Sequence, residues 1–127
     1  MNRFFDPVSP LQIQARLLRL AGVFLFLYSL ILTLAPAARA RTWAVDYRWS
    51  HWLGFAVWAV IFTLAHILSC HRLPDADPYI LPIAGLLTGW GTLTIYRLVP
   101  GFGMRQTAWL MVCGLVSLEM FATRSEK

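Results

Sequence analysis

The side chains best suited to chemistry are few and lie far apart in the sequence. His66 lies deep within an apolar segment, whereas His51 and His71 lie near its two ends. A lone imidazole at membrane depth can ligate haem iron or the magnesium of a chlorophyll. Phe62, one helical turn earlier, would crowd the face of such a macrocycle. We therefore expect no cofactor and an interhelical or interfacial hydrogen bond for His66, with a bound pigment or haem as the alternative.

A second group of potential ligands surrounds the end of the same segment. Cys70 and His71 are followed by Asp75 and Asp77. These ligand types are mixed, and their spacing matches no common metal site, so no metal is expected. Cys113 lies inside another apolar segment, where a free cysteine behaves as a small apolar residue.

Glu119 is the only acidic residue within an apolar segment. Ionisable groups inside membranes often mark functional sites. Its neighbours Thr123 and Arg124 instead favour an interfacial position for its carboxylate. The sequence contains no nucleophile–base pair, glycine-rich phosphate loop or paired carboxylates, so no catalytic residue is assigned. The basic residues are scattered, which gives no indication of nucleic-acid binding.

Two glycines one helical turn apart, Gly85 and Gly89, form a small-x-x-x-small motif. Such a motif leaves a groove in which a second helix can approach closely. Thr88 and Thr92 could add interhelical hydrogen bonds there. We expect the second helix to belong to the same bundle, with a helix of a partner subunit as the alternative.

The composition explains why these residues must lie on membrane helices. Of 127 residues, 58% are hydrophobic and 13% are charged, against roughly a quarter charged in soluble domains. This composition excludes a disordered chain and disfavours a soluble enzyme. A bilayer core needs about 20 apolar helical residues. We therefore predict an all-α fold, a single polytopic integral membrane helical bundle with four transmembrane helices. The expected spans are residues 19–38, 49–71, 78–96 and 106–123.

Proline and capping residues predict where the helices begin and end. Pro36 is expected to end the first span. Asp77 is a suitable helix N-cap, and Pro78 suits the first helical position. Residues 99–103 are expected to form a turn before the last span. Residues 11–20 are amphipathic and predict a short interfacial lead-in to the first span.

Aromatic and basic residues near the ends of the spans are expected to anchor the bundle at the membrane surface. The expected anchors are Trp43, Trp49, Trp52, Arg97 and Arg105. The chain has 11 basic and 6 acidic residues, an excess that suits anionic lipid headgroups. Basic residues are divided almost equally between the two sides, so charge does not determine the orientation. The first apolar run, followed by Ala38-Arg39-Ala40, also has features of a secretory signal peptide.

The second half of the sequence resembles the FtsW/RodA/SpoVE family, the SEDS proteins of cell division and elongation. The matching elements, in order, are Ala65-His66, Asp77-Pro78, Pro82, Gly89-Trp90-Gly91, Tyr96-Arg97-Leu98 and Arg105-Gln106. The resemblance implies a cytoplasmic turn at Asp77-Pro78 and both termini on the cytoplasmic side of a bacterial inner membrane. Val99 stands where the family commonly has an aspartate. The family's acidic catalytic residue lies in a downstream loop that has no counterpart here.

Three functions are therefore considered. The leading expectation is a non-catalytic accessory or structural subunit that docks on a larger membrane protein complex. The first alternative is a truncated or split part of a lipid-linked peptidoglycan glycosyltransferase involved in cell division or shape. The second is a subunit of a respiratory or photosynthetic complex that carries a pigment or haem at His66. Lipid and a membrane complex are the expected partners.

Overall fold

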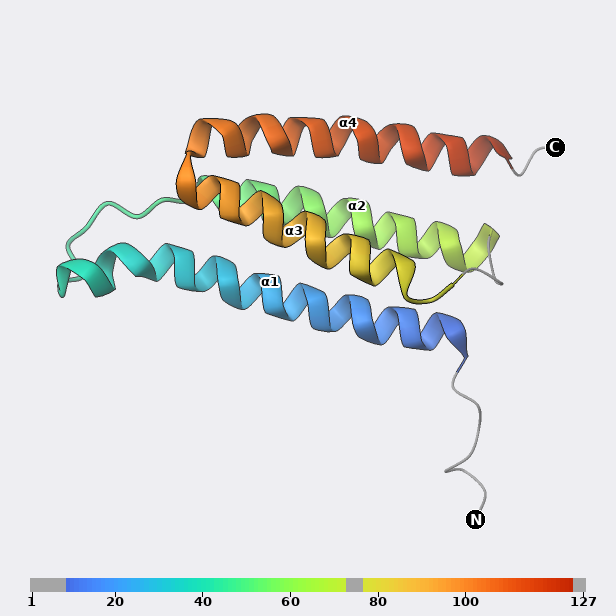
Figure 1. Ribbon diagram of the computed structural model, residues 1–127, viewed down its shortest axis with the longest axis horizontal. Helices are drawn as coiled ribbons and strands as arrows, with labels where there is room; N and C mark the ends of the chain where they lie inside the picture. Colours follow the sequence, from blue (N-terminus) through green and yellow to red (C-terminus); the bar gives the residue numbers. More distant parts are fainter. Residues whose placement is uncertain (1–8, 73–76, 125–127) are drawn as a thin grey trace, which may run out of the picture.

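The structure, a computed structural model, describes residues 9–72 and 77–124. These residues form four helices and no strand (Figure 1), which confirms the all-α prediction. The helices are α1 (Pro10–Ala40), α2 (Ser50–Arg72), α3 (Ile80–Leu98) and α4 (Pro100–Arg124).

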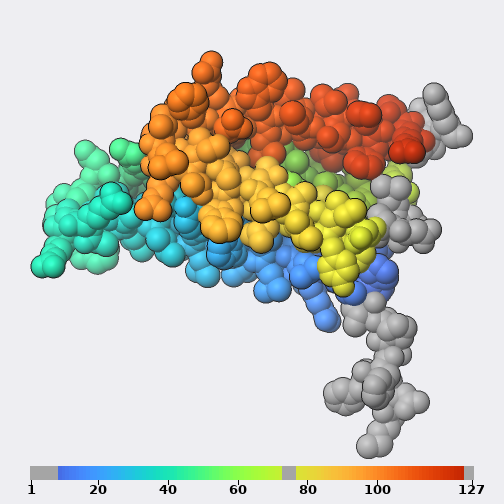
Figure 2. All heavy atoms as spheres, viewed as in Figure 1, coloured from blue at the N-terminus to red at the C-terminus, as the bar shows by residue number. Residues whose placement is uncertain are grey.

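The chain runs back and forth, so that consecutive helices are antiparallel (Figure 1). Helices α2 and α3 lie in the middle and contact each other. Helix α1 packs on both of them, and so does α4, but within the described residues α1 and α4 do not contact each other. In the space-filling view α1 and α4 form opposite edges of the bundle, with α3 between them on the visible face (Figure 2).

The two ends of the bundle differ in the residues that they bring together. The beginning of α1 and the end of α4 lie at one end (Figure 1). We call the opposite end, where α1 and α3 finish and α2 and α4 begin, the basic end. Its basic residues are Arg39, Arg41, Arg48, Arg97 and Arg105.

Three of the helices, α1, α2 and α4, are long and apolar enough to cross a membrane, which indicates a membrane protein. Helix α4 is the least apolar of the three. Helix α3 does not meet the same criterion, because three glycines, three threonines and Arg97 dilute its leucines and isoleucines. The prediction of four spans is therefore supported for three helices only.

Helix α1 is longer than predicted at both ends. The Ser9 hydroxyl accepts a hydrogen bond from the Gln12 backbone N–H (3.3 Å), and Pro10 occupies the first turn. The predicted lead-in at residues 11–20 is therefore part of one continuous helix. The prediction that Pro36 ends the helix is wrong, since α1 continues to Ala40. One proline removes a single backbone hydrogen bond, and membrane helices commonly tolerate that loss.

The boundaries of α3 and α4 also depart from the predicted caps. Asp77 accepts a hydrogen bond from the Tyr79 N–H (2.9 Å) in a turn, and α3 begins only at Ile80. Asp77 therefore does not cap the helix, and Pro78 precedes it. The predicted turn at residues 99–103 shortens to Val99, because Pro100 already begins α4. Proline suits this position, where its missing N–H would have no helical partner.

The core of the bundle lies where α1, α2 and α3 meet. Its largest buried residues include Leu25 from α1, Trp58 and Phe62 from α2, and Leu93 from α3. Phe55 stacks beside Trp58, with ring centroids 5.9 Å apart. These large side chains fill the space that the small residues of α3 leave open.

Candidate functional site

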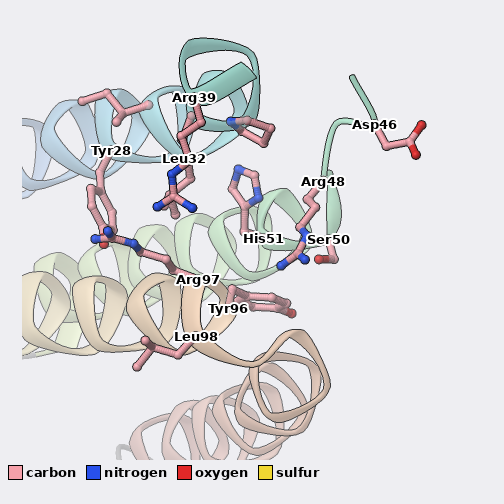
Figure 3. Close-up of a pocket in the computed structure, with 13 residues that line it drawn as sticks. Tyr28, Leu32, Arg39, Asp46, Arg48, Ser50, His51, Tyr96, Arg97 and Leu98 are labelled. Atoms are coloured by element: carbon pink, nitrogen blue, oxygen red, sulfur yellow. The ribbon is translucent and has the colours of Figure 1, made fainter. Parts of the chain in front are cut away.

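A cavity of about 700 Å³ opens at the basic end of the bundle. It lies between the end of α1, the beginning of α2 and the end of α3, as the close-up shows (Figure 3). Its apolar lining includes Tyr28, Leu32 and Leu98. Its charged and polar lining consists of Arg39, Asp46, Arg48, Ser50, His51 and Arg97, with Tyr96 beside them.

The antiparallel topology brings the three arginines of the cavity together. Arg39 lies in the last turn of α1, and Arg97 lies in the last turn of α3. Arg48 belongs to the connection that leads into α2. The side chains of Arg39 and Arg97 reach into the space between α1 and α3, whereas the carboxylate of Asp46 points away from it (Figure 3).

The electrostatics of the cavity are one-sided. Within residues 9–72 and 77–124, none of the three guanidinium groups forms an ion pair or a hydrogen bond, and Asp46 has no ion-pair partner either. Three positive charges and one negative charge therefore share a cavity beside apolar helices. In such a region charges attract and repel more strongly than in bulk water.

A buried hydrogen-bond network lies beneath the cavity and joins α1 to α2. The Nε2–H of His51 donates to the Ser29 carbonyl (2.9 Å) and lies 3.0 Å from Thr33 Oγ1. The Thr33 hydroxyl donates to the same carbonyl (3.0 Å) and accepts from the Trp52 indole N–H (2.9 Å). The Ser29 hydroxyl, fully buried, has no hydrogen-bond partner among the residues that the structure describes. His51 thereby has a defined orientation, with its Nε2 proton directed at α1.

Tyr96 joins the end of α3 to α4 behind the cavity. Its ring occupies space above two glycines: a Cβ at Gly54 would lie 2.7 Å from the ring, and one at Gly103 would collide with it. Its hydroxyl lies 2.7 Å from Thr107 Oγ1 and 3.3 Å from Met104 Sδ. This contact fixes the end of α3 against α4, next to Arg97 in the sequence.

The small-residue motif of α3 faces the interior of this bundle. A Cβ at Gly85 would lie 3.2 Å from Phe62, and one at Gly89 would collide with Leu25. The Trp58 indole donates a hydrogen bond to the Gly85 carbonyl (2.7 Å). Both glycines therefore pack against helices of the same chain.

Within the described residues, neither Thr88 nor Thr92 makes the predicted side-chain hydrogen bond to another helix. The Thr92 hydroxyl donates to the Thr88 carbonyl, 2.8 Å away and one turn earlier in α3. The hydrogen bonds that α3 makes to other helices come instead from the Gly85 carbonyl, Thr94 and Tyr96.

His66 forms a hydrogen bond between α1 and α2. Its Nδ1 lies 2.9 Å from Oε1 of Gln14, a residue that is 3% exposed. Its Nε2 lies 3.7 Å from the Cys70 sulfur. A smaller cavity of about 330 Å³ adjoins the imidazole and is lined in part by Phe62 and Arg19. The expected interhelical hydrogen bond is thus present, with a glutamine partner that the sequence did not reveal.

The predicted anchors all lie at the basic end. Trp43 is 79% exposed and Trp49 is 63% exposed, and Arg97 and Arg105 are also exposed. Trp52 differs from them, because it is half-buried and its indole N–H is bonded to Thr33. It is part of the network beneath the cavity as well as of the aromatic belt.

The remaining candidate residues are spread over the bundle. Cys70 is half-buried, and His71, Cys113 and Glu119 are exposed. Asp75 lies outside the described residues. Among those that are described, no three histidine, cysteine, aspartate or glutamate residues gather as metal ligands would.

Comparison of the chain with protein-family models, curated proteins and solved structures finds no match. The resemblance to the SEDS family therefore stays a prediction.

Proposed function

We propose that this chain is a four-span integral membrane protein that acts as a non-catalytic accessory subunit and docks on a larger membrane complex through α4. The observation that carries the proposal is the combination of apolarity and exposure in α4. Of the three helices apolar enough to span a membrane, it is the least apolar. It also buries the fewest residues, with Gly103 and Thr107 alone classed as buried.

The fourth span would be α3. A helix that faces lipid must be strongly apolar, whereas a helix surrounded by protein can contain small and polar residues. Helix α3 contacts all three other helices. Gly85, Gly89 and Thr92 lie on buried positions that pack against protein. Its modest apolarity is thus compatible with a central membrane-spanning position.

The exposed surface of α4 suits protein better than lipid. It displays large apolar side chains, including Trp109, Leu115 and Met120. It also displays Ser117 and Glu119. A carboxylate beside apolar side chains is costly against hydrocarbon, whereas a partner helix can supply a hydrogen bond or a cation.

The orientation and the membrane belong to the same proposal. The beginning of α1 and the end of α4 lie at the same end of the bundle (Figure 1), as four crossings require. The resemblance to the SEDS family favours the cytoplasm of a bacterial cell for that end. Cysteine labelling in a Cys70→Ala, Cys113→Ala background tests the orientation. A membrane-impermeant maleimide should label Ala44→Cys and not His71→Cys in intact cells, and the reverse pattern would contradict it.

Site-specific cross-linking tests the docking surface. A photoreactive amino acid replaces Leu115 on α4 (53% exposed) or, as the matched control, Ile31 on α1 (63% exposed). Irradiation of native membranes is followed by purification in mild detergent and mass spectrometry. We expect one defined membrane protein, recovered with the chain in constant ratio, to be cross-linked from position 115 and not from position 31. Equal cross-linking from both positions, or lipid adducts alone, would overturn the proposal.

A further inference from the structure

We propose that the cavity at the basic end binds the phosphodiester headgroup of an anionic phospholipid, with Arg39, Arg48 and Arg97 as its ligands. This inference is independent of the partner proposed for α4. It rests on the charge of the cavity, its position along the bundle and the chemistry of its walls.

The three guanidinium groups present unused hydrogen-bond donors around one space. Within the described residues none of them has an ion-pair or hydrogen-bond partner, although all three line the same cavity. A guanidinium group offers donors in a planar fork that matches the oxygens of a phosphate. Bound phosphate would accept these donors and offset the repulsion between the three cations.

A bound anion would stabilise Arg48 more than it would stabilise Arg39 or Arg97. Arg39 and Arg97 lie in the last turns of α1 and α3, where a cation offsets the partial negative charge of a helix C-terminus. Arg48 lies just before Ser50, the first residue of α2, and no acidic residue occupies the first turn of that helix. A cation beside the partial positive charge of a helix N-terminus is unfavourable unless a negative charge accompanies it.

The walls of the cavity favour a lipid over free phosphate. Its volume of about 700 Å³ lies within the range of small-molecule sites. Apolar residues line the cavity beside the arginines, and two of them, Ile31 and Leu98, are also exposed on the surface of the bundle. A ligand with a phosphate at one end and hydrocarbon at the other fits both parts.

The cavity also lies at the depth of the headgroups. The exposed indoles of Trp43 and Trp49 belong to the same end of the bundle, and such residues collect at the membrane–water interface. Basic pockets between helices at this depth are suited to acidic lipid headgroups.

Lipid titration of the purified full-length chain tests the proposal. The protein is delipidated in detergent, and bound lipid is then measured by native mass spectrometry. Phosphatidylglycerol is compared with phosphatidylcholine of the same acyl chains, and inorganic phosphate is added as a competitor. We expect phosphatidylglycerol to bind about tenfold more tightly than phosphatidylcholine, because the choline cation of phosphatidylcholine is repelled by the three arginines. We expect millimolar phosphate to displace little of it.

Matched arginine variants locate the binding. Arg39→Gln and Arg97→Gln should each weaken phosphatidylglycerol binding about tenfold, because each removes charged donors from the cavity. Arg105→Gln is the control, since Arg105 lies at the same end but does not line the cavity. Circular dichroism checks that each variant retains its helices. Arg39→Lys preserves the charge but removes the planar fork of donors, so we expect it to weaken phosphatidylglycerol binding less than Arg39→Gln does.

Three results would overturn the proposal. Equal binding of the two lipids would remove the charge requirement. Equal weakening by Arg105→Gln would show attraction to the whole basic end and no defined site. Displacement of the lipid by inorganic phosphate at comparable concentration would assign the cavity to a free anion.

Discussion

The indole nitrogen of Trp58 lies 2.7 Å from the carbonyl oxygen of Gly85 and donates a hydrogen bond to it. The two residues belong to different helices, α2 and α3, and both are buried. The indole can approach the α3 backbone this closely because Gly89 has no side chain: a Cβ there would lie 2.9 Å from the indole nitrogen. At the centre of the bundle, α2 and α3 are thus held together both by close packing and by a hydrogen bond.

Trp58→Phe should lower the stability of the bundle by about 1 kcal/mol, because it removes this hydrogen bond while keeping an aromatic ring in the core. Thermal unfolding in detergent micelles measures the change. Trp109→Phe is the control, since Trp109 is 64% exposed on α4 and should have little effect. Equal shifts in the two variants would show that the buried indole N–H contributes nothing specific.

Gly89→Ala should destabilise the bundle by about 1–3 kcal/mol, the usual cost of overpacking. The added methyl group would collide with Leu25 and lie 2.9 Å from the Trp58 indole nitrogen. Gly91→Ala is the matched control, because nothing lies within 4 Å of the position its Cβ would take. Unfolding midpoints of the two variants decide the question, and a harmless Gly89→Ala would show that α3 has room to shift.

Ser29→Ala should be neutral or slightly stabilising, because the fully buried Ser29 hydroxyl has no partner to lose. Thr33→Ala should instead destabilise by about 1–3 kcal/mol, since it leaves the Trp52 indole N–H without its acceptor. Ser29 and Thr33 lie one helical turn apart and are similar in size, but their hydroxyl groups differ in hydrogen-bond partners. A larger loss for Ser29→Ala than for Thr33→Ala would refute the network beneath the cavity.

The purified chain should show no tetrapyrrole absorption band that depends on His66. The imidazole Nδ1 already bonds to Gln14, and Nε2 faces the Cys70 sulfur. An absorbance spectrum of protein purified from its native membrane, compared with that of His66→Phe, checks this expectation. A Soret or near-infrared band lost in the variant would restore the pigment or haem alternative.

The sequence predicts a helix correctly where an uninterrupted hydrophobic run is bounded by charged residues. The second span was expected at residues 49–71, and α2 is Ser50–Arg72. The errors occur at prolines. Pro36 and Pro100 were both read as breaks, yet one lies inside α1 and the other begins α4. The presence of a proline in the sequence does not show whether it ends, begins or lies within a helix. That depends on whether the surrounding structure satisfies the backbone groups that the proline leaves without a hydrogen bond.

The cavity was predictable only in part. Arg97 and the tryptophans were expected at the membrane surface from their positions near helix ends. The predicted topology placed Arg39 and Arg48 on the same side of the membrane as Arg97, but nothing in the sequence shows that the three line one cavity. The partners of His66 and His51 are likewise distant in sequence, as Gln14 is 52 residues from His66 and Ser29 is 22 from His51.

The connection between α3 and α4 consists of Val99 alone, and this has a consequence for how the chain enters a membrane. A single extended residue spans only about 3–4 Å, so the two helices cannot be separated by the width of a bilayer. In the four-span arrangement proposed above, they would insert together as a helical hairpin. Helix α3, which is too weakly apolar to qualify as a span by itself, would then be inserted with the help of α4, and a longer linker at this position would expose it to insertion on its own.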